Sequence, residues 1–175
     1  MIRIILVISV MIMFGAFTPV QAETRSAEAE VHNTEGEKVG TLTLVQESDM
    51  VKITMEGSNL PPGFHGFHIH EVGECEPPFT SAGDHYNPEG ADHPNHAGDL
   101  PNLLVNDDGS AFLVVKTDRF RLNELFEGDG SALIIHSEPD NFANIPQRYT
   151  QELDEQTLDT GDAGDRIACG VIERK

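Results

Sequence analysis

Histidine is the residue type in this sequence whose number and spacing most clearly suggest chemistry. Six of the eight histidines lie between residues 63 and 99, at positions 65, 68, 70, 85, 93 and 96. Neutral imidazole is a common nitrogen ligand for zinc and copper, and a carboxylate can complete a zinc site. A lone histidine is usually structural, but so many rings in a short stretch favour a metal centre.

The pair His68 and His70 also indicates how this centre is positioned. Residues 64–71 are typical of a β strand, and alternate side chains of a strand point to opposite faces. His68 and His70 would therefore face one side, while Phe67 and Ile69 would anchor the strand in a core. One strand can thus present two imidazoles together.

The segment from residue 72 to residue 99 has no regular pattern and is interrupted by prolines and glycines. A long irregular segment in a compact domain needs something to hold it in place. A metal ion and a disulfide would both do this.

The first residues predict a secretory signal at 1–22. Arg3 precedes an apolar run, and Val20-Gln21-Ala22 is a small-residue cleavage site. The apolar run is too short to span a bilayer, so we expect no membrane anchor. The mature protein would be one domain over residues 23–175, either periplasmic or secreted.

The chain is strongly acidic, with a formal net charge of −19. Such a surface excludes nucleic acid and anionic lipid as partners. It also repels any anionic substrate, so a site for an anion needs a local positive charge.

The two cysteines, Cys75 and Cys169, lie in a chain that we expect to be exported. In an oxidising compartment they should form a disulfide, the alternative being two buried free thiols.

Alternation of apolar and polar residues predicts about eight short strands and no long helix. Residues 23–30 are read as a polar, frayed start, and residues 118–126 fit either a helical turn or a strand. A second long loop covers residues 141–165. The expected fold is all-β and antiparallel, with strands at 29–33, 38–45, 51–56, 64–71, 103–105, 111–115, 132–136 and 166–172.

Several motifs in this order resemble the copper/zinc superoxide dismutase family. They are Gly-Phe-His-Gly-Phe-His-Ile-His-Glu (63–71), His-Tyr-Asn-Pro (85–88), His-Ala-Gly-Asp-Leu-Pro-Asn (96–102) and Gly-Asp-Ala-Gly-Asp-Arg-Ile-Ala-Cys-Gly (161–170). The resemblance covers nearly all of the mature chain and is of the bacterial secreted type. It implies an eight-stranded antiparallel Greek-key β-barrel or sandwich with two long functional loops.

The resemblance also implies two ligand sets that share one ring. Copper would be bound by His68, His70, His85 and His136, and zinc by His85, His93, His96 and Asp99. Asp140 would link His68 to His93, and His65 would be a structural neighbour of the copper site. The residue types suit these metals, because an all-imidazole set favours copper, and three histidines with one aspartate close a tetrahedral zinc site.

The activity implied by the resemblance is conversion of superoxide to O2 and hydrogen peroxide by Cu(II)/Cu(I) cycling at a His-bridged copper–zinc site. Arg166 would guide the anion, since guanidinium stays charged, and His85 would carry a proton. A homodimer is possible. The chain departs from the animal pattern in its short spacing between His93 and His96 and in Asp159, where animal enzymes carry a lysine.

Two other functions have to be weighed. A non-catalytic copper- and zinc-binding protein on the same fold should lack a copper ligand or the guiding arginine, and neither is missing. A zinc hydrolase would need an open zinc position and a nearby carboxylate base. The four histidines expected at copper leave no role for such a base.

Overall fold

The computed structural model describes residues 25–150 and 152–175, so the predicted signal at 1–22 lies outside the described residues. The described chain forms one ten-stranded sheet, two short 3-10 helices and one short α helix. The strands are β1 (Ser26–Asn33), β2 (Lys38–Glu47), β3 (Met50–Gly57), β4 (Gly63–His65), β5 (Phe67–His70), β6 (Leu103–Val105), β7 (Ala111–Thr117), β8 (Ala132–His136), β9 (Arg166–Val171) and β10 (Glu173–Arg174). The helices are η1 (Thr80–Ala82), η2 (Leu122–Phe126) and α1 (Glu155–Thr160).

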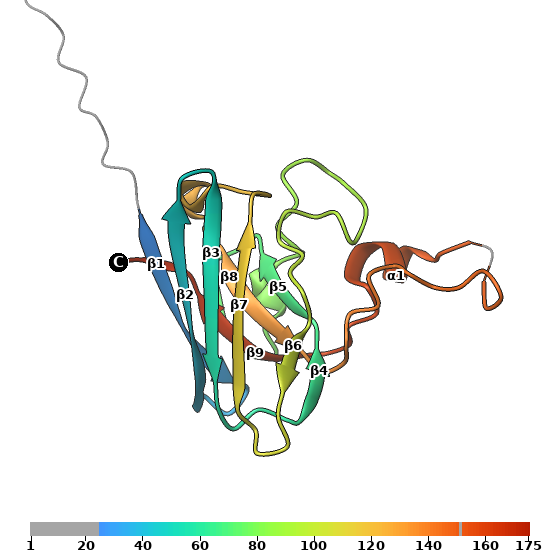
Figure 1. Cartoon of the computed structure of the whole chain (residues 1–175), viewed down its shortest axis with the longest axis horizontal. Helices are drawn as coiled ribbons and strands as arrows, with labels where there is room; N and C mark the ends of the chain where they lie inside the picture. Colours follow the sequence, from blue (N-terminus) through green and yellow to red (C-terminus); the bar gives the residue numbers. More distant parts are fainter. Residues whose placement is uncertain (1–24, 151) are drawn as a thin grey trace, which may run out of the picture.

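The sheet curls into a nearly closed antiparallel barrel (Figure 1). Its strand order is β4-β6-β7-β3-β2-β1-β9-β8-β5, and β10 pairs with β1. The strands at the two ends of this order, β4 and β5, follow each other along the chain, so the two edges of the sheet come together. Connections that skip neighbouring strands, such as β3 to β4 and β7 to β8, are typical of Greek-key arrangements. The predicted all-β barrel is confirmed.

The expected single strand over 64–71 is wrong, because the chain breaks at Gly66 into two strands with different partners. β4 pairs with β6, whereas β5 pairs with β8. A Cβ atom on Gly66 would lie 2.6 Å from the Cβ of Ala163, so a side chain does not fit there. Glycine lets the backbone approach closely as it passes from one strand partner to the next. Counting β4 and β5 as one strand and omitting the two-residue β10 recovers the eight strands expected.

The frayed start expected over residues 23–30 is also wrong from Ser26 onward. Ser26 pairs with Val45, and the register with β2 continues to Val31 and Gly40. Ala27 and Ala29 are fully or almost fully buried, so small side chains supply the inward face of β1. In the ambiguous segment, the structure places the 3-10 helix η2.

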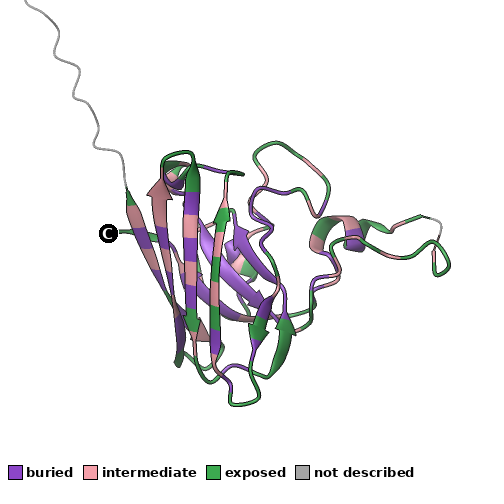
Figure 2. Cartoon of the chain, viewed as in Figure 1, coloured by how far each residue is buried: buried purple, intermediate pink, exposed green. Residues whose placement is uncertain are grey.

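The core fills the barrel with alternate residues from facing strands (Figure 2). On β5, Phe67 and Ile69 belong to this core, as the two-residue period predicted. Leu133 and Ile135 of β8 join them. The apolar side chains thereby fix β5 and β8 against the barrel, and the histidines on the other face of β5 have a rigid support.

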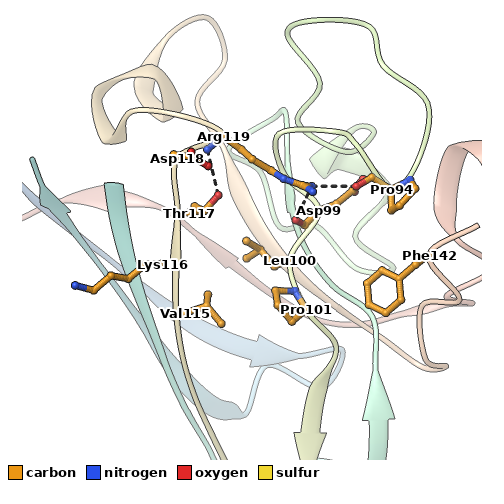
Figure 3. Close-up of a pocket in the computed structure, with 10 residues that line it drawn as sticks. All are labelled: Pro94, Asp99, Leu100, Pro101, Val115, Lys116, Thr117, Asp118, Arg119 and Phe142. Carbon is orange, nitrogen blue, oxygen red and sulfur yellow. Dashed lines mark hydrogen bonds between the residues drawn. The ribbon is translucent and has the colours of Figure 1, made fainter. Parts of the chain in front are cut away.

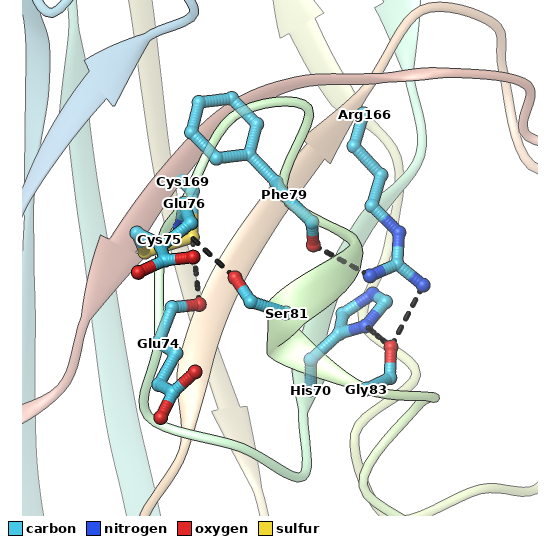
Figure 4. Close-up of a disulfide and its surroundings, with 9 residues drawn as sticks. All are labelled: His70, Glu74, Cys75, Glu76, Phe79, Ser81, Gly83, Arg166 and Cys169. Atoms are coloured by element: carbon cyan, nitrogen blue, oxygen red, sulfur yellow. Dashed lines mark hydrogen bonds between the residues drawn. A yellow bond between two sulfur atoms is a disulfide. The ribbon is translucent and has the colours of Figure 1, made fainter.

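A disulfide between Cys75 and Cys169 fastens the first long loop to β9, as predicted (Figure 4). The two cysteines are 94 residues apart in the sequence. In the chain-entropy model, a loop of this length restricts the unfolded chain and stabilises the fold by about 4 to 5 kcal/mol. Phe79, Ala132 and Ile134 pack around it. None of the helices in the described part of the chain is both long and apolar enough to cross a bilayer.

Candidate metal centre

Strands β5 and β8 position three of the histidines. The two strands pair with His68 opposite Ile134 and His70 opposite Ala132, and His136 is the last residue of β8. The His136 ring lies 4.9 Å from the His68 ring and 5.7 Å from the His70 ring, measured between centroids. All three side chains are buried although they face away from the apolar core.

The first long loop brings the other histidines to the same place by lying along β5. Tyr86 N donates to Ile69 O at 2.8 Å, and Ile69 N donates to Gly98 O at 2.9 Å. The middle and the end of the loop therefore bond to the backbone of β5, the terminal strand of the sheet order. A Cβ on Gly98 would lie 2.2 Å from Ile69 O, so only glycine permits this approach. The loop thus covers an edge strand and sets its histidines beside His68 and His70.

Two groups of side chains result, and both match the predicted ligand sets in composition. In each group one ligand atom per residue lies within 4.8 Å of the others, and all the residues are buried. The first group is His68, His70, His85 and His136, and the second is His85, His93, His96 and Asp99. His85 belongs to both.

The hydrogen bonds of the first group leave one nitrogen of each ring without a partner. His68 Nε2 contacts Asp140 Oδ2 at 2.9 Å, His70 Nδ1 contacts Gly83 O at 2.9 Å, and His136 Nδ1 contacts Gly164 O at 3.2 Å. The opposite nitrogens are buried and have no hydrogen-bond partner, as is also true of His85 Nε2. Buried polar atoms are rarely left unpaired. Four unpaired imidazole nitrogens fit a copper ion.

The ligand atoms of the second group lie close to one another. Asp99 Oδ1 lies 2.7 Å from His85 Nδ1, and Asp99 Oδ2 lies 3.0 Å from His93 Nδ1. His96 Nδ1 lies 3.3 Å from both Asp99 Oδ2 and His85 Nδ1. Three Nδ1 atoms and a carboxylate are a closed four-ligand set, which fits zinc.

The charges in the two groups differ. Burial lowers the pKa of His68 to about 4 and the pKa of His136 to about 3, so both rings are neutral at physiological pH, as metal ligands must be. Burial also opposes charge on His93, but the Asp140 and Asp99 carboxylates outweigh it and raise the pKa of His93 to about 9. A cation in the second group therefore replaces a proton on His93.

Asp140 joins the two groups from outside. Its Oδ2 contacts His68 Nε2 at 2.9 Å and its Oδ1 contacts His93 Nε2 at 2.8 Å. Burial raises the carboxyl pKa, but these two hydrogen bonds outweigh it and hold the pKa of Asp140 below its usual range. Asn102 fixes the Asp140 backbone, since its Nδ2 donates to Asp140 O at 2.9 Å and its Oδ1 accepts from Asp140 N at 2.8 Å.

Arg166 begins β9, and its guanidinium lies near His70. Nη1 donates to Phe79 O and Nη2 donates to Gly83 O, each at 2.7 Å (Figure 4). Burial lowers the pKa of Arg166, and the nearby Asp84 opposes this shift. The guanidinium lines a cavity of about 690 Å³ that His70, His85 and His136 also line.

The same cavity is otherwise rich in acid, with Glu71, Asp84, Asp159 and Asp165 among its lining residues. Arg148 does not line this cavity. Its guanidinium lies over the neighbouring Tyr149 ring, 4.8 Å from the ring centroid. His65 contacts His136 O with one ring nitrogen and Pro61 O with the other, so it is no ligand in either group.

Sequence reasoning missed the residues that act through the backbone or through lack of volume. The carbonyls of Gly83 and Gly164 hold two of the rings, but a carbonyl oxygen is common to every residue and leaves no sequence signal. Asn102 is the last residue of the 96–102 motif. The motif draws attention to Asn102 but does not indicate what its side chain contacts.

Comparisons with known proteins agree with this geometry. Residues 38–172 match the sequence model for "Copper/zinc superoxide dismutase (SODC)". The chain is 45% identical over 158 residues to superoxide dismutase [Cu-Zn] of Mycobacterium tuberculosis, covering 79% of this chain and 66% of that protein, just under two thirds of its length. It is 38% identical over 167 residues to superoxide dismutase [Cu-Zn] 1 of Aquifex aeolicus, covering 87% and 90%. The crystal structure of a double mutant of a SOD-like protein from Bacillus subtilis is similar, with a TM-score of 0.70 and 34% identity, over 82% of this chain and 95% of that one.

A glycine next to Asp140 gives a test of the second group. A Cβ on Gly161 would lie 2.1 Å from Asp140 Oδ1 and 2.5 Å from His93 Nε2. We expect Gly161→Ala to displace the hydrogen bond between Asp140 Oδ1 and His93 Nε2. Zinc binding should then weaken about 10- to 100-fold, as measured by competition with a chelator. Gly128→Ala is the matched control, because Gly128 has a φ of 58° against 60° at Gly161 but has open space around it. Equal zinc affinity in the two variants would contradict the prediction.

Proposed function

The chain belongs to the copper/zinc superoxide dismutase family, and from this we propose that it converts superoxide to O2 and hydrogen peroxide. In the balanced reaction, two superoxide anions and two protons give one O2 and one H2O2. The observation that carries the proposal is the set of four buried imidazole nitrogens without partners, beside a second cluster that shares His85.

Copper and zinc are the cofactors that the family and the two clusters indicate. We assign copper to His68, His70, His85 and His136, and zinc to His85, His93, His96 and Asp99. When bound, copper supplies a one-electron Cu(II)/Cu(I) couple and zinc supplies a positive charge without redox chemistry.

The residues of the chain bind and orient the substrate and supply a proton. Arg166 projects into the cavity as a cation held by two carbonyls, so it can hold an anion next to the first cluster. His85 Nε2 belongs to that cluster and has no hydrogen-bond partner, so we place the proton to be delivered on this atom in the state in which it is not a copper ligand. Asp140 keeps the His68 ring oriented with Nδ1 toward the cluster.

The two other functions weighed above are less well supported. A zinc hydrolase needs an open zinc position, but the second cluster brings four donors together and closes the set. A storage protein needs no guiding cation, but Arg166 lines the cavity with the histidines.

We also propose that residues 1–22 are a secretory signal and that the mature domain, residues 23–175, works in the periplasm or outside the cell. The disulfide between Cys75 and Cys169 supports this location, because such bonds persist in oxidising compartments.

We further propose that the mature protein forms a homodimer through the outer face of β4, β6 and β7. Four exposed apolar side chains lie on this face, namely Phe64, Leu104, Phe112 and Val114. Phe64 lies opposite Leu104 in the β4–β6 pair, and β7 adjoins β6. An apolar surface of this kind can bury itself against a second copy across a two-fold axis.

The first test of the activity is loss of a copper ligand. We expect His136→Ala to slow superoxide loss by the metal-loaded protein at least about 100-fold, because it removes a direct donor, whereas loss of an outer partner alone costs about 10- to 100-fold. Stopped-flow decay of superoxide measures the rate. His32→Ala is the control, since His32 lies on β1 and outside both clusters. Unchanged activity in His136→Ala, or no activity in the loaded wild type, would overturn the proposal.

The second test addresses the guiding cation. We expect Arg166→Glu to lower kcat/KM for superoxide at least about tenfold while the copper content stays the same, because the cavity loses its local positive charge. Arg148→Glu makes the same charge change outside the cavity and should have a much smaller effect. If Arg166→Glu retains the wild-type rate, Arg166 does not guide the substrate.

The dimer is tested by sedimentation of the mature protein. Phe112→Glu places a charge on the apolar face and should shift the mass from dimer to monomer. Tyr149→Glu alters an exposed aromatic residue elsewhere and should leave the mass unchanged. A monomeric wild type would rule out the dimer without bearing on the activity.

A further inference from the structure

Arg119 contacts the loop that carries the second cluster, although it contributes no ligand to it. Its Nη1 donates to Pro94 O at 3.0 Å, to His96 O at 3.1 Å and to Asp99 O at 3.3 Å. Figure 3 shows the guanidinium reaching from the end of β7 to the loop. We propose that Arg119 is a positioning residue for zinc, because it holds the backbone that presents His96 and Asp99.

The segment between His93 and Asp99 needs such a support. It has no helix or strand, and several of its backbone hydrogen bonds span only three residues, as in Asn95 N to Asp92 O and Asp99 N to His96 O. These bonds shape the turn but do not fix it to the barrel, and the backbone bond from Ile69 N to Gly98 O joins only its end to β5. The guanidinium comes from a distant part of the chain and joins three carbonyls of this turn at once.

Arg119 is itself well anchored. Its neighbour Phe120 is buried with 3% of its surface exposed, and the Phe120 ring meets the Tyr86 ring edge to face at 6.3 Å between centroids. Tyr86 follows the shared ligand His85. The segment that carries Arg119 is therefore held against the same loop at a second point, through Phe120 and Tyr86.

The contacts avoid the ligand atoms. Arg119 donates to the main-chain oxygen of Asp99, whereas the Asp99 carboxylate oxygens contact His85, His93 and His96. A cation bound to the carboxylate would compete with the metal for its ligand. A cation bound to the carbonyls can order the turn without doing so. The three carbonyls share the two hydrogens of Nη1, so at least one hydrogen lies between two acceptors.

The inference rests on the proposed assignment of zinc to the second cluster, and zinc affinity tests both separately. We expect Arg119→Gln to raise the zinc dissociation constant of the full mature protein about 10- to 100-fold, as found when outer partners of metal ligands are removed. Copper affinity, measured in zinc-free protein, should stay unchanged. Arg119→Lys keeps a charged donor and should lie between the wild type and Arg119→Gln.

Arg121→Gln is the matched control. It removes the same charge two residues away, where the side chain contacts Ser48 O and Asp49 instead of the metal loop. Hydrogen exchange of the metal-free protein gives a readout that does not depend on zinc, since amides of residues 93–99 should exchange faster in Arg119→Gln than in Arg121→Gln.

The outcomes are distinct. If Arg119→Gln and Arg121→Gln bind zinc equally well, the inference is wrong, even if the unfolding midpoint of Arg119→Gln is lower. If the wild type itself binds no zinc at these residues, the proposed zinc assignment fails and the inference fails with it. Weaker zinc binding in Arg119→Gln, partial recovery in Arg119→Lys and unchanged copper affinity would support the inference.

Discussion

Each ring of the first cluster is held at one nitrogen by the protein and left open at the other. An oxygen of Asp140, Gly83, Gly164 or Asp99 contacts the held nitrogen of His68, His70, His136 or His85, respectively. Because one nitrogen is hydrogen-bonded to an oxygen, both the tautomer and the direction of each ring are fixed before a metal binds. Burial reinforces it, since the low pKa values of His68 and His136 keep these rings neutral.

The fold brings the oxygens that hold these rings from distant parts of the sequence to one edge of the barrel. Gly164 comes from the second long loop and Asp140 directly precedes it, whereas Gly83 comes from the first. The two loops also bond to each other, as in His93 N to Leu158 O. The barrel strands supply a rigid wall with His68, His70 and His136, and the loops close over it. Neither part would orient the rings alone.

The sequence was sufficient for the elements with a clear local pattern. The strands Leu103–Val105 and Ala132–His136 were predicted with the observed bounds, because short apolar runs between turn residues have few other solutions. The break at Gly66 was not predictable, since the lack of space for a side chain there comes from Ala163, which lies almost one hundred residues away. The ligand types could be inferred from histidine spacing. The supporting roles of Asn102, Gly161 and Arg119 could not, because they depend on backbone atoms and on space that only the folded chain defines.

The disulfide lies on the same loop as the two carbonyls that hold Arg166. Cys75 is tethered to β9, and Phe79 and Gly83 follow it within eight residues. Arg166 lies on β9 itself, three residues before Cys169. Oxidation of the two thiols therefore locks the acceptors of the guanidinium to the strand that bears it. A chain whose two cysteines stay reduced would lack this lock, so the position of Arg166 at the cavity depends on the redox state of a bond outside the histidine clusters.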